Sequence, residues 1–453
     1  MANILVAGCG HGGVVAAWKL AAAGHAVTVY EKALRGALGH EAQDAFDAAS
    51  MQYAGIEIPA HYWAENNRLT FIPLDADAPA LTMPKVEPSK TLKADRRELI
   101  AYLISLAEAA GARFEFGCEI TAPIVLGNRI AGFVTADGRQ VVGDLVIDAC
   151  GVHSPLRAQL PGFTMIEREP GPYAVLHAYR AYFRRDTQTR QPATPYNVYL
   201  TDDGTVGLSW VVTGETDVDI LVARFGAVEA ADLLHVMREF HARNPHLTMQ
   251  QIRGGRTADI PVRQPLAMLV ADGYAAVGDA AFMTHALKGS GIAYSLMAGT
   301  ILAESVLADT SGFYTTETLW EYERRFFREI GFDACRIAIM KNLLPYIKAQ
   351  EVSDLFRRGL LNSEEVAAFS GIKITKLIAL ANDKLRMLGE FPAFRTKLRN
   401  LIVWLGRFAV LEPSFPNKYT PEDAAKWTER YNEFFDSIRY RPQEDAPPAA
   451  QEQ

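Results

Sequence analysis

Apolar and polar residues at the N-terminus alternate in a pattern that predicts a strand, a Gly-rich turn, a helix and a second strand. The first strand is Asn3–Ala7, and an Ala-rich stretch follows the turn. A further helix is predicted from about Arg97 to Ala110, because leucines recur there at helical spacing. This order of elements is typical of a βαβ unit with a parallel sheet.

Further along the chain the pattern changes twice. Strand-like stretches near residues 119–126, 129–136 and 140–148 form a meander with Gly127-Asn128 and Asp137-Gly138 at its turns. Alternating strands at 174–183, 197–201, 205–212 and 217–224 predict an antiparallel sheet with one buried face, interrupted by a helix at about 228–242. A strand at 274–277 returns to the first pattern, and helical signals dominate from about residue 316.

Composition excludes several classes of protein. The formal net charge of −7 gives no reason to expect nucleic-acid binding. The four cysteines form no CxxC pair, so we expect neither a metal site nor a disulfide framework, and free thiols favour a cytoplasmic location. We expect no signal peptide and no membrane span, and the Pro-, Ala- and Gln-rich tail 441–453 is expected to be disordered.

The first chemical motif is the GxGxxG run from Gly8 through Gly10 to Gly13, placed between the strand and the helix. Such a turn lets a pyrophosphate approach the backbone at a helix N-terminus, and His11 lies within it. Glu31 ends the next strand, 21 residues after Gly10, where a carboxylate accepts hydrogen bonds from an adenosine ribose. The arrangement predicts dinucleotide binding, and the alternative is a turn used only for packing.

The second chemical motif begins at Gly278-Asp279, where a strand ends, and continues to Gly289-Ser-Gly291-Ile292, where a long helix begins. Asp279 can hold a ribityl or ribose hydroxyl, and the amides at Gly289–Ile292 can face a flavin pyrimidine ring. The alternative is a second packing turn. A further strand end, Asp148–Arg157 with Gly151 in its turn, is consistent with either role.

These motifs, in this order and spacing, resemble the geranylgeranyl reductase family within the para-hydroxybenzoate hydroxylase superfamily of FAD proteins. The family's second flavin motif matches Gly278-Asp-Ala-Ala281, Gly289-Ser-Gly-Ile292 and Gly299. Its arginine before a Rossmann helix matches Arg96, and Trp320–Arg328 resembles the start of its C-terminal domain. The resemblance spans roughly residues 3 to 430.

The resemblance implies an α/β fold with a discontinuous Rossmann-type FAD-binding domain, an inserted antiparallel-sheet substrate domain and an α-helical C-terminal domain. The expected divisions are 1–35, 92–157 and 265–310 for FAD binding, 36–91 and 158–264 for substrate, and 311–440 for the helical domain. The residues expected to bind FAD are Gly8, Gly10, His11, Gly13, Glu31, Lys32, Arg96, Gly151, Gly278, Asp279, Gly289, Gly291 and Ile292.

The implied activity is the reduction of carbon–carbon double bonds in an isoprenoid or other apolar substrate by hydride transfer from reduced flavin. Three departures from the family pattern bear on this activity. The family's cysteine is absent from Lys32–Pro59, where His40 lies; its substrate signature survives only as Trp210; and Ala286 replaces its proline. The superfamily's hydroxylase Asp-Gly and halogenase Trp-x-Trp motifs are also absent.

The proton source and the partners stay open in the sequence. His40, His285 and Tyr294 are candidates to supply a proton near the flavin, and each also fits a packing role. The electron donor is NAD(P)H bound transiently or a separate carrier. Leu398–Leu411 fits either a buried helix or a peripheral membrane contact that admits a lipid. The alternative functions are an FAD monooxygenase or halogenase acting on an aromatic, and a cyclase, isomerase or binding protein without net redox turnover.

Overall fold

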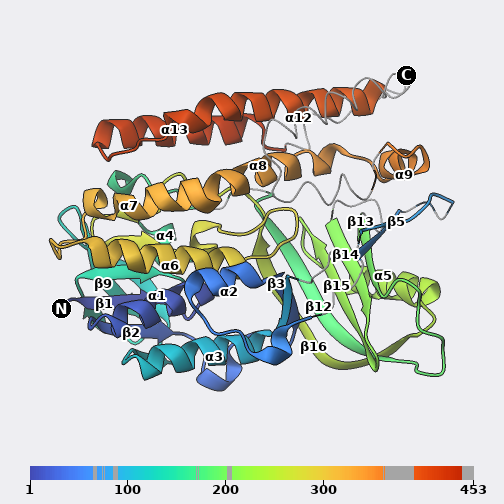
Figure 1. Cartoon of the computed structure of the whole chain (residues 1–453), viewed down its shortest axis with the longest axis horizontal. Helices are drawn as coiled ribbons and strands as arrows, with labels where there is room; N and C mark the ends of the chain where they lie inside the picture. The colour runs from blue at the N-terminus through green and yellow to red at the C-terminus, as the bar shows by residue number, and fades with distance from the viewer. Residues whose placement is uncertain are drawn as a thin grey trace, which may run out of the picture.

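The fold is seen in a computed structural model, which describes residues 1–64, 69–73, 75, 77–84, 90–169, 171, 173–200, 207–360, 362 and 392–440. The predicted tail lies outside these residues. Two large sheets lie side by side, and a layer of long helices covers them along one side (Figure 1).

The first sheet has six strands in the order β17-β18-β11-β1-β2-β7. β1 (Asn3–Ala7), β2 (Ala26–Glu31), β7 (Arg113–Phe116), β11 (Leu145–Asp148) and β18 (Tyr274–Ala276) run parallel, and β17 (Val270–Ala271) pairs antiparallel to β18. Ala7 pairs with Tyr30 on one side and with Asp148 on the other. The turns that follow these three strands therefore meet at one edge of the sheet, where ligands bind in open α/β sheets.

Three helices pack around this sheet. α1 (His11–Ala22) crosses both α3 (Arg96–Ala109) and α6 (Ile292–Ala308). The crossing of α1 and α6 needs glycine, because a Cβ added at Gly299 would lie 2.2 Å from the carbonyl oxygen of Gly12. The predicted helix at 97–110 is confirmed as α3.

Two smaller sheets complete this half of the molecule. β8 (Ile120–Leu126), β9 (Arg129–Thr135) and β10 (Gln140–Val142) form the expected meander. The expected strand at 140–148 was wrong as one element, because Gly143 and Asp144 separate β10 from β11 and the two join different sheets. β3 (Gln43–Asp47), which leads into α2 (Ala48–Ala54), pairs with β6 (Thr91–Asp95), and neither strand was predicted.

The second large sheet has seven strands in the order β16-β12-β15-β14-β13-β4-β5. The antiparallel strands predicted from alternation are confirmed as β12 (Val175–Arg185), β13 (Tyr196–Leu200), β14 (Gly207–Thr213) and β15 (Asp217–Arg224). β16 (Leu247–Pro261) was not predicted, and it pairs along β12 with several register shifts. β16 and β5 (Leu81–Thr82) are the edge strands, β4 (Leu69–Ile72) lies between β13 and β5, and α5 (Ala230–Arg243) packs against one face.

Helices form the remainder of the described chain. α7 (Thr316–Phe326) continues through a π-helical turn at Phe327–Gly331 into α8 (Phe332–Lys341), and α9 (Ala349–Arg357) follows. α12 (Pro392–Leu411) and α13 (Pro421–Ser437) lie over α7 and α8 along the top of the view in Figure 1. α12 buries Leu398, Leu401, Leu405 and Phe408 and exposes Val403 and Val410. Among the described residues, no helix combines the length and apolar character needed to cross a bilayer.

Candidate functional site

One end of the site is the turn between β1 and α1. Gly8 has a φ of +89°, and a Cβ there would lie 2.5 Å from the carbonyl oxygen of Ala149, so only glycine fits this close packing against the loop after β11. Gly10 precedes α1 in an extended conformation and, as a glycine, has no side chain with which to cap the helix. The first N–H groups of α1 therefore remain available to an anion such as a pyrophosphate.

Two side chains frame this turn. The Glu31 carboxylate accepts hydrogen bonds from the backbone N–H groups of Cys9 and Ala33, both at 2.8 Å, which fix it at the end of β2 beside the turn. Its remaining lone pairs can accept ribose hydroxyls. His11 Nε2 is buried without a hydrogen-bond partner among the described residues, and burial, reinforced by nearby Arg96, lowers its pKa to about 4. A neutral imidazole at this point can donate to a phosphate oxygen.

The other end of the site is the turn between β18 and α6. Asp279 lies in a short 3₁₀ turn, and its Oδ1 accepts a hydrogen bond from Thr284 Oγ1 at 3.0 Å. Burial raises the pKa of Asp279. A Cβ at Gly291, the residue before α6, would lie 3.0 Å from Asp279 Oδ1, so the carboxylate sits directly against the start of a helix that no side chain caps.

These two ends fit FAD. A dinucleotide needs a carboxylate for its ribose, a helix N-terminus for its pyrophosphate and polar groups for its ribityl chain, and the chain supplies each from a different turn at one sheet edge. The unpartnered, buried His11 nitrogen is the observation that most directly requires a ligand. Lys32 is exposed after Glu31, and Gly151 lies in the loop after β11. Their roles and those of the other site residues stay predictions.

A cavity opens beside the second end of the site, with about 180 Å³ accessible to the centres of water molecules. One wall is the large antiparallel sheet, from which apolar side chains point inward, and a second wall is Ala286–Gly289 before α6. The third wall runs from the end of α8 to α9, and the fourth is the segment before β3 together with Arg96. The apolar lining consists of Ala42, Leu176, Ala178, Leu208, Trp210, Leu221, Ala223, Phe225, Ala258, Ile260, Val262, Ala286, Leu287, Leu344, Ile347 and Val352.

Among the candidate proton donors, His40 lines this cavity whereas His285 and Tyr294 do not. Burial, followed by the positive charge of Arg96, lowers the pKa of His40. Both ring nitrogens of His285 are buried without a hydrogen-bond partner among the described residues, and burial lowers its pKa to about 4. Its ring lies 6.3 Å from that of Tyr294, whose pKa burial raises.

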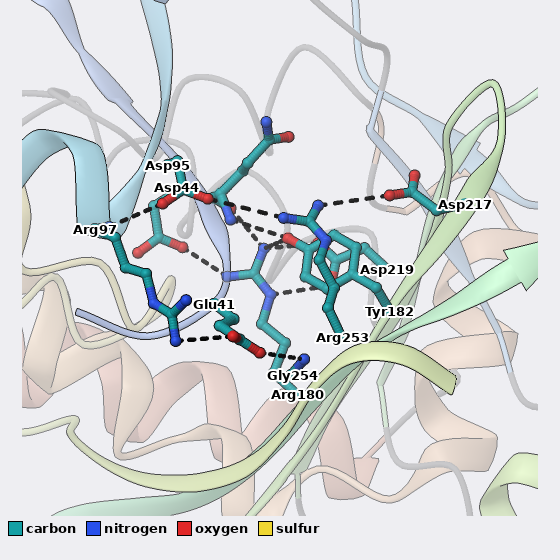
Figure 2. A network of polar contacts seen from close by, with 11 residues as sticks. Glu41, Asp44, Asp95, Arg97, Arg180, Tyr182, Asp217, Asp219, Arg253 and Gly254 are labelled. Atoms are coloured by element: carbon teal, nitrogen blue, oxygen red, sulfur yellow. Dashed lines mark hydrogen bonds and ion pairs between the residues drawn. The ribbon is translucent and has the colours of Figure 1, made fainter. Parts of the chain in front are cut away.

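A polar network fixes the segment that carries His40 (Figure 2). Arg180 on β12 donates to both oxygens of Asp219, at 2.9 and 2.6 Å, and to Asp44 Oδ1 at 2.7 Å. It also donates to the carbonyl oxygen of Gln43 at 2.6 Å. Although burial opposes ionisation, Arg96 and Arg180 hold the pKa of Asp44 below its usual value. The network therefore joins β3 to the antiparallel sheet through charged hydrogen bonds.

Glu41 makes a second connection between the same elements. It pairs with Arg97 at 2.8 Å and accepts the backbone N–H of Gly254 at 3.0 Å, so α3 and β16 hold it from two sides (Figure 2). Arg253 lies over the Tyr182 ring, with its guanidinium carbon 3.6 Å from the ring centroid. The segment that carries His40 is therefore held in place both by α3 and by the large antiparallel sheet.

Trp210, the expected substrate residue, lines the cavity from β14. Its ring faces the Arg180 guanidinium at 5.1 Å, and its Nε1 is buried without a hydrogen-bond partner among the described residues. Sequence reasoning did not identify Arg180, Arg256 or Lys341, although all three line the cavity. Alternation along β12 was the available signal for Arg180, because it shares a strand face with Leu176 and Ala178.

Comparisons with known proteins agree with this geometry. A family model described as FAD dependent oxidoreductase matches residues 88–305. The digeranylgeranylglycerophospholipid reductase of Sulfolobus acidocaldarius is 20% identical over 94% of this chain and 95% of its own length. That of Methanothrix thermoacetophila is 34% identical, but the match spans only 22% of this chain and 29% of the relative. A solved geranylgeranyl bacteriochlorophyll reductase-like protein from Thermoplasma acidophilum superposes with a TM-score of 0.71, at 20% identity, over 88% of this chain and 99% of that chain.

The fold, the two ends of the nucleotide site and the family match define an FAD-dependent oxidoreductase. Within that class, the relatives reported above are named digeranylgeranylglycerophospholipid reductases and the solved structure is named a geranylgeranyl bacteriochlorophyll reductase-like protein, in agreement with the resemblance stated from the sequence motifs. The fold class and the cofactor predicted with it are also confirmed. The division of the chain into domains stays a prediction.

Proposed function

We propose that this protein reduces carbon–carbon double bonds of an isoprenoid or similarly apolar chain. The observation that carries the proposal is the cavity, whose lining is mainly aliphatic and which reaches Gly289 at the flavin end of the site. Each methylene buried against such a wall gains about 0.8 kcal/mol, so a long hydrocarbon chain binds here without needing specific hydrogen bonds. The relatives reported above are named as digeranylgeranylglycerophospholipid reductases, which supports a substrate of this kind.

The chain's own residues divide the remaining work. FAD, when bound, supplies the two-electron reduction chemistry. The aliphatic walls orient the substrate and exclude water, Ile260 narrows the space beside Gly289, and Trp210 lines the same cavity. His40 is the cavity-lining imidazole and is proposed to move the proton that completes saturation of the double bond. The electrons come from NAD(P)H bound transiently or from a separate carrier.

An anaerobic assay tests the proposal. The holoenzyme is reduced chemically, prenyl lipids and aromatic polyenes are added, and flavin reoxidation is followed together with product mass. We expect reoxidation by prenyl compounds and a gain of two mass units per double bond. Turnover that requires oxygen and adds an oxygen or halogen atom would instead establish an oxygenase or halogenase, and conversion without a change in mass would establish an isomerase.

A cavity-filling variant links the activity to this cavity. Ala223 is buried on β15 with its side chain against the cavity, so Ala223→Phe should slow reoxidation by long prenyl chains while FAD remains bound. Ala181 lies on β12 in the core on the opposite face of the sheet, and Ala181→Val serves as the control for disturbance of the sheet. Equal loss of activity in both variants would show that the activity does not depend on the space in this cavity.

A further inference from the structure

Lys341, the last residue of α8, is a buried cation in the wall of the apolar cavity. The residue is only 4% exposed, and it also lines a small second cavity with Tyr173, Arg263 and Arg439. Two other cations that line the main cavity, Arg256 and Lys288, are exposed. Lys341 lines the cavity from the end of α8, whereas His40 lines it from the segment before β3, so the two residues belong to different walls.

The contacts of Lys341 are neutral. Its Nζ donates to the carbonyl oxygen of Tyr173 at 2.9 Å and approaches Asn342 Oδ1 at 3.4 Å, and it lies 5.1 Å from the centroid of the Phe225 ring. The backbone of Tyr173 is in the left-handed conformation, with a φ of +58°. An ammonium group has three donors, so one donor direction remains after these two acceptors.

No carboxylate among the described residues forms an ion pair with Lys341. The charged groups that act on it are two further cations, Arg263 and Arg439, and these are already paired with Glu167 at 2.5 Å and Asp436 at 2.7 Å. Burial, followed by these two cations, lowers the pKa of Lys341 to about 7. A buried ammonium without an anion is costly, and an aliphatic residue would pack at this place without that cost.

We propose that Lys341 binds an acidic oxygen group, a carboxylate or a phosphate, on the substrate that fills the apolar cavity. An anion at Nζ would form a charged hydrogen bond in a water-poor site, where such bonds are strong. The preferred substrate is then an anionic amphiphile, with its hydrocarbon part along the sheet and its acid group at the end of α8. This inference rests on one part of the proposed function, that an apolar chain occupies the cavity. It does not depend on the reduction of a double bond.

Ligand binding to the oxidised holoenzyme tests the inference independently of turnover. Three probes of the same chain length are compared, a prenyl carboxylic acid, a prenyl monophosphate and a prenyl alcohol, with the shift in flavin absorbance or the heat of binding as the signal. We expect at least one acid to bind wild type more tightly than the alcohol does. Lys341→Met should weaken that acid at least tenfold and leave the alcohol within twofold, and Lys341→Arg should retain part of the preference. Which of the two acids responds distinguishes a carboxylate from a phosphate.

Proton uptake supplies a second measurement. At pH 8 most of the lysine is neutral in the free enzyme, and an anion that pairs with it raises its pKa, so acid binding should take up close to one proton. Calorimetry in buffers of different ionisation enthalpy measures this uptake, which Lys341→Met should abolish. The FAD content and thermal unfolding of each variant show whether it is folded.

Two results would overturn the inference. One is that neither acid binds wild type more tightly than the alcohol, and the other is that Lys341→Met weakens acid and alcohol equally. Failure of the proposed function is distinguishable, because acids would then bind through Lys341 while no double bond is reduced.

Discussion

Replacing Arg180 with methionine should destabilise the protein by about 3–5 kcal/mol, because it leaves a buried carboxylate without its cation. The Arg180 and Asp219 side chains are only 16% and 12% exposed, and their ion pair at 2.6 Å is the contact that neutralises Asp219. Asp44 is affected less, because Arg96 still lies 3.3 Å away. Most of the lost stability therefore comes from the unpaired Asp219 carboxylate. Removing that carboxylate as well should restore most of the lost stability.

A double-mutant cycle measures this coupling. Urea unfolding measures the loss of unfolding free energy in Arg180→Met, in Asp219→Leu and in the double variant. The loss in the double variant should be smaller than the sum of the two single losses by at least about 2 kcal/mol. Arg184→Met is the matched control, because Arg184 is exposed on the same strand and should change stability by no more than about 0.5 kcal/mol. A loss below about 1 kcal/mol for Arg180→Met, or additive single losses, would refute the view that the network holds a desolvated ion pair.

Further predictions concern the cofactor and the proton. Asp279→Ala should weaken FAD binding by about 1.5–3 kcal/mol, roughly 10- to 150-fold in Kd, when apoprotein is titrated with FAD, whereas Thr284→Val should change it less. Gly10→Val should abolish flavin retention, because even a Cβ at Gly10 lies 3.1 Å from the Ala149 carbonyl oxygen; a yellow, FAD-loaded variant would contradict this. If His40 supplies the proton directly, reoxidation should accelerate as the pH falls toward its lowered pKa, where the imidazole becomes protonated, and His40→Ala should remove the acceleration. A pH profile shared by wild type and variant would assign the proton to another group.

The nucleotide half of the fold was predictable because its signals are local. A glycine turn, a helix start and an acid at a strand end lie within one βαβ unit, so spacing alone predicts which groups meet. β16 was missed because two glycines with positive φ, Gly254 and Gly255, interrupt its alternation, and because it exposes apolar residues such as Met249 and Ile252 together with polar ones. β3 and β6 were missed because each is short and is stabilised by pairing with a strand more than forty residues away.

The cavity was less predictable than the nucleotide site, because charged residues such as those that line it are usually found on the protein surface. Arg180 is flanked along β12 by tyrosine and alanine, and only the inward face that it shares with Ala178 reveals that it is buried. Lys341 follows an apolar stretch of α8, where helical periodicity alone does not show whether the last turn faces solvent. Burial of each depends on partners from distant segments, Asp44 and Asp219 for Arg180 and Tyr173 for Lys341, and spacing along the chain carries no information about these contacts.

The place of His40 acquires a physical meaning once the cavity is known. A half-buried imidazole beside Arg96 has a lowered pKa, so near neutral pH it carries one proton and one lone pair. In that state it can pass a proton from one ring nitrogen while accepting another from water at the other nitrogen. Arg180 and Glu41 hold the flanking segment against the sheet, so the position of this imidazole depends on the same network whose stability the Arg180 cycle measures. A relay through His40 therefore requires the contact between β3 and the large sheet to remain intact.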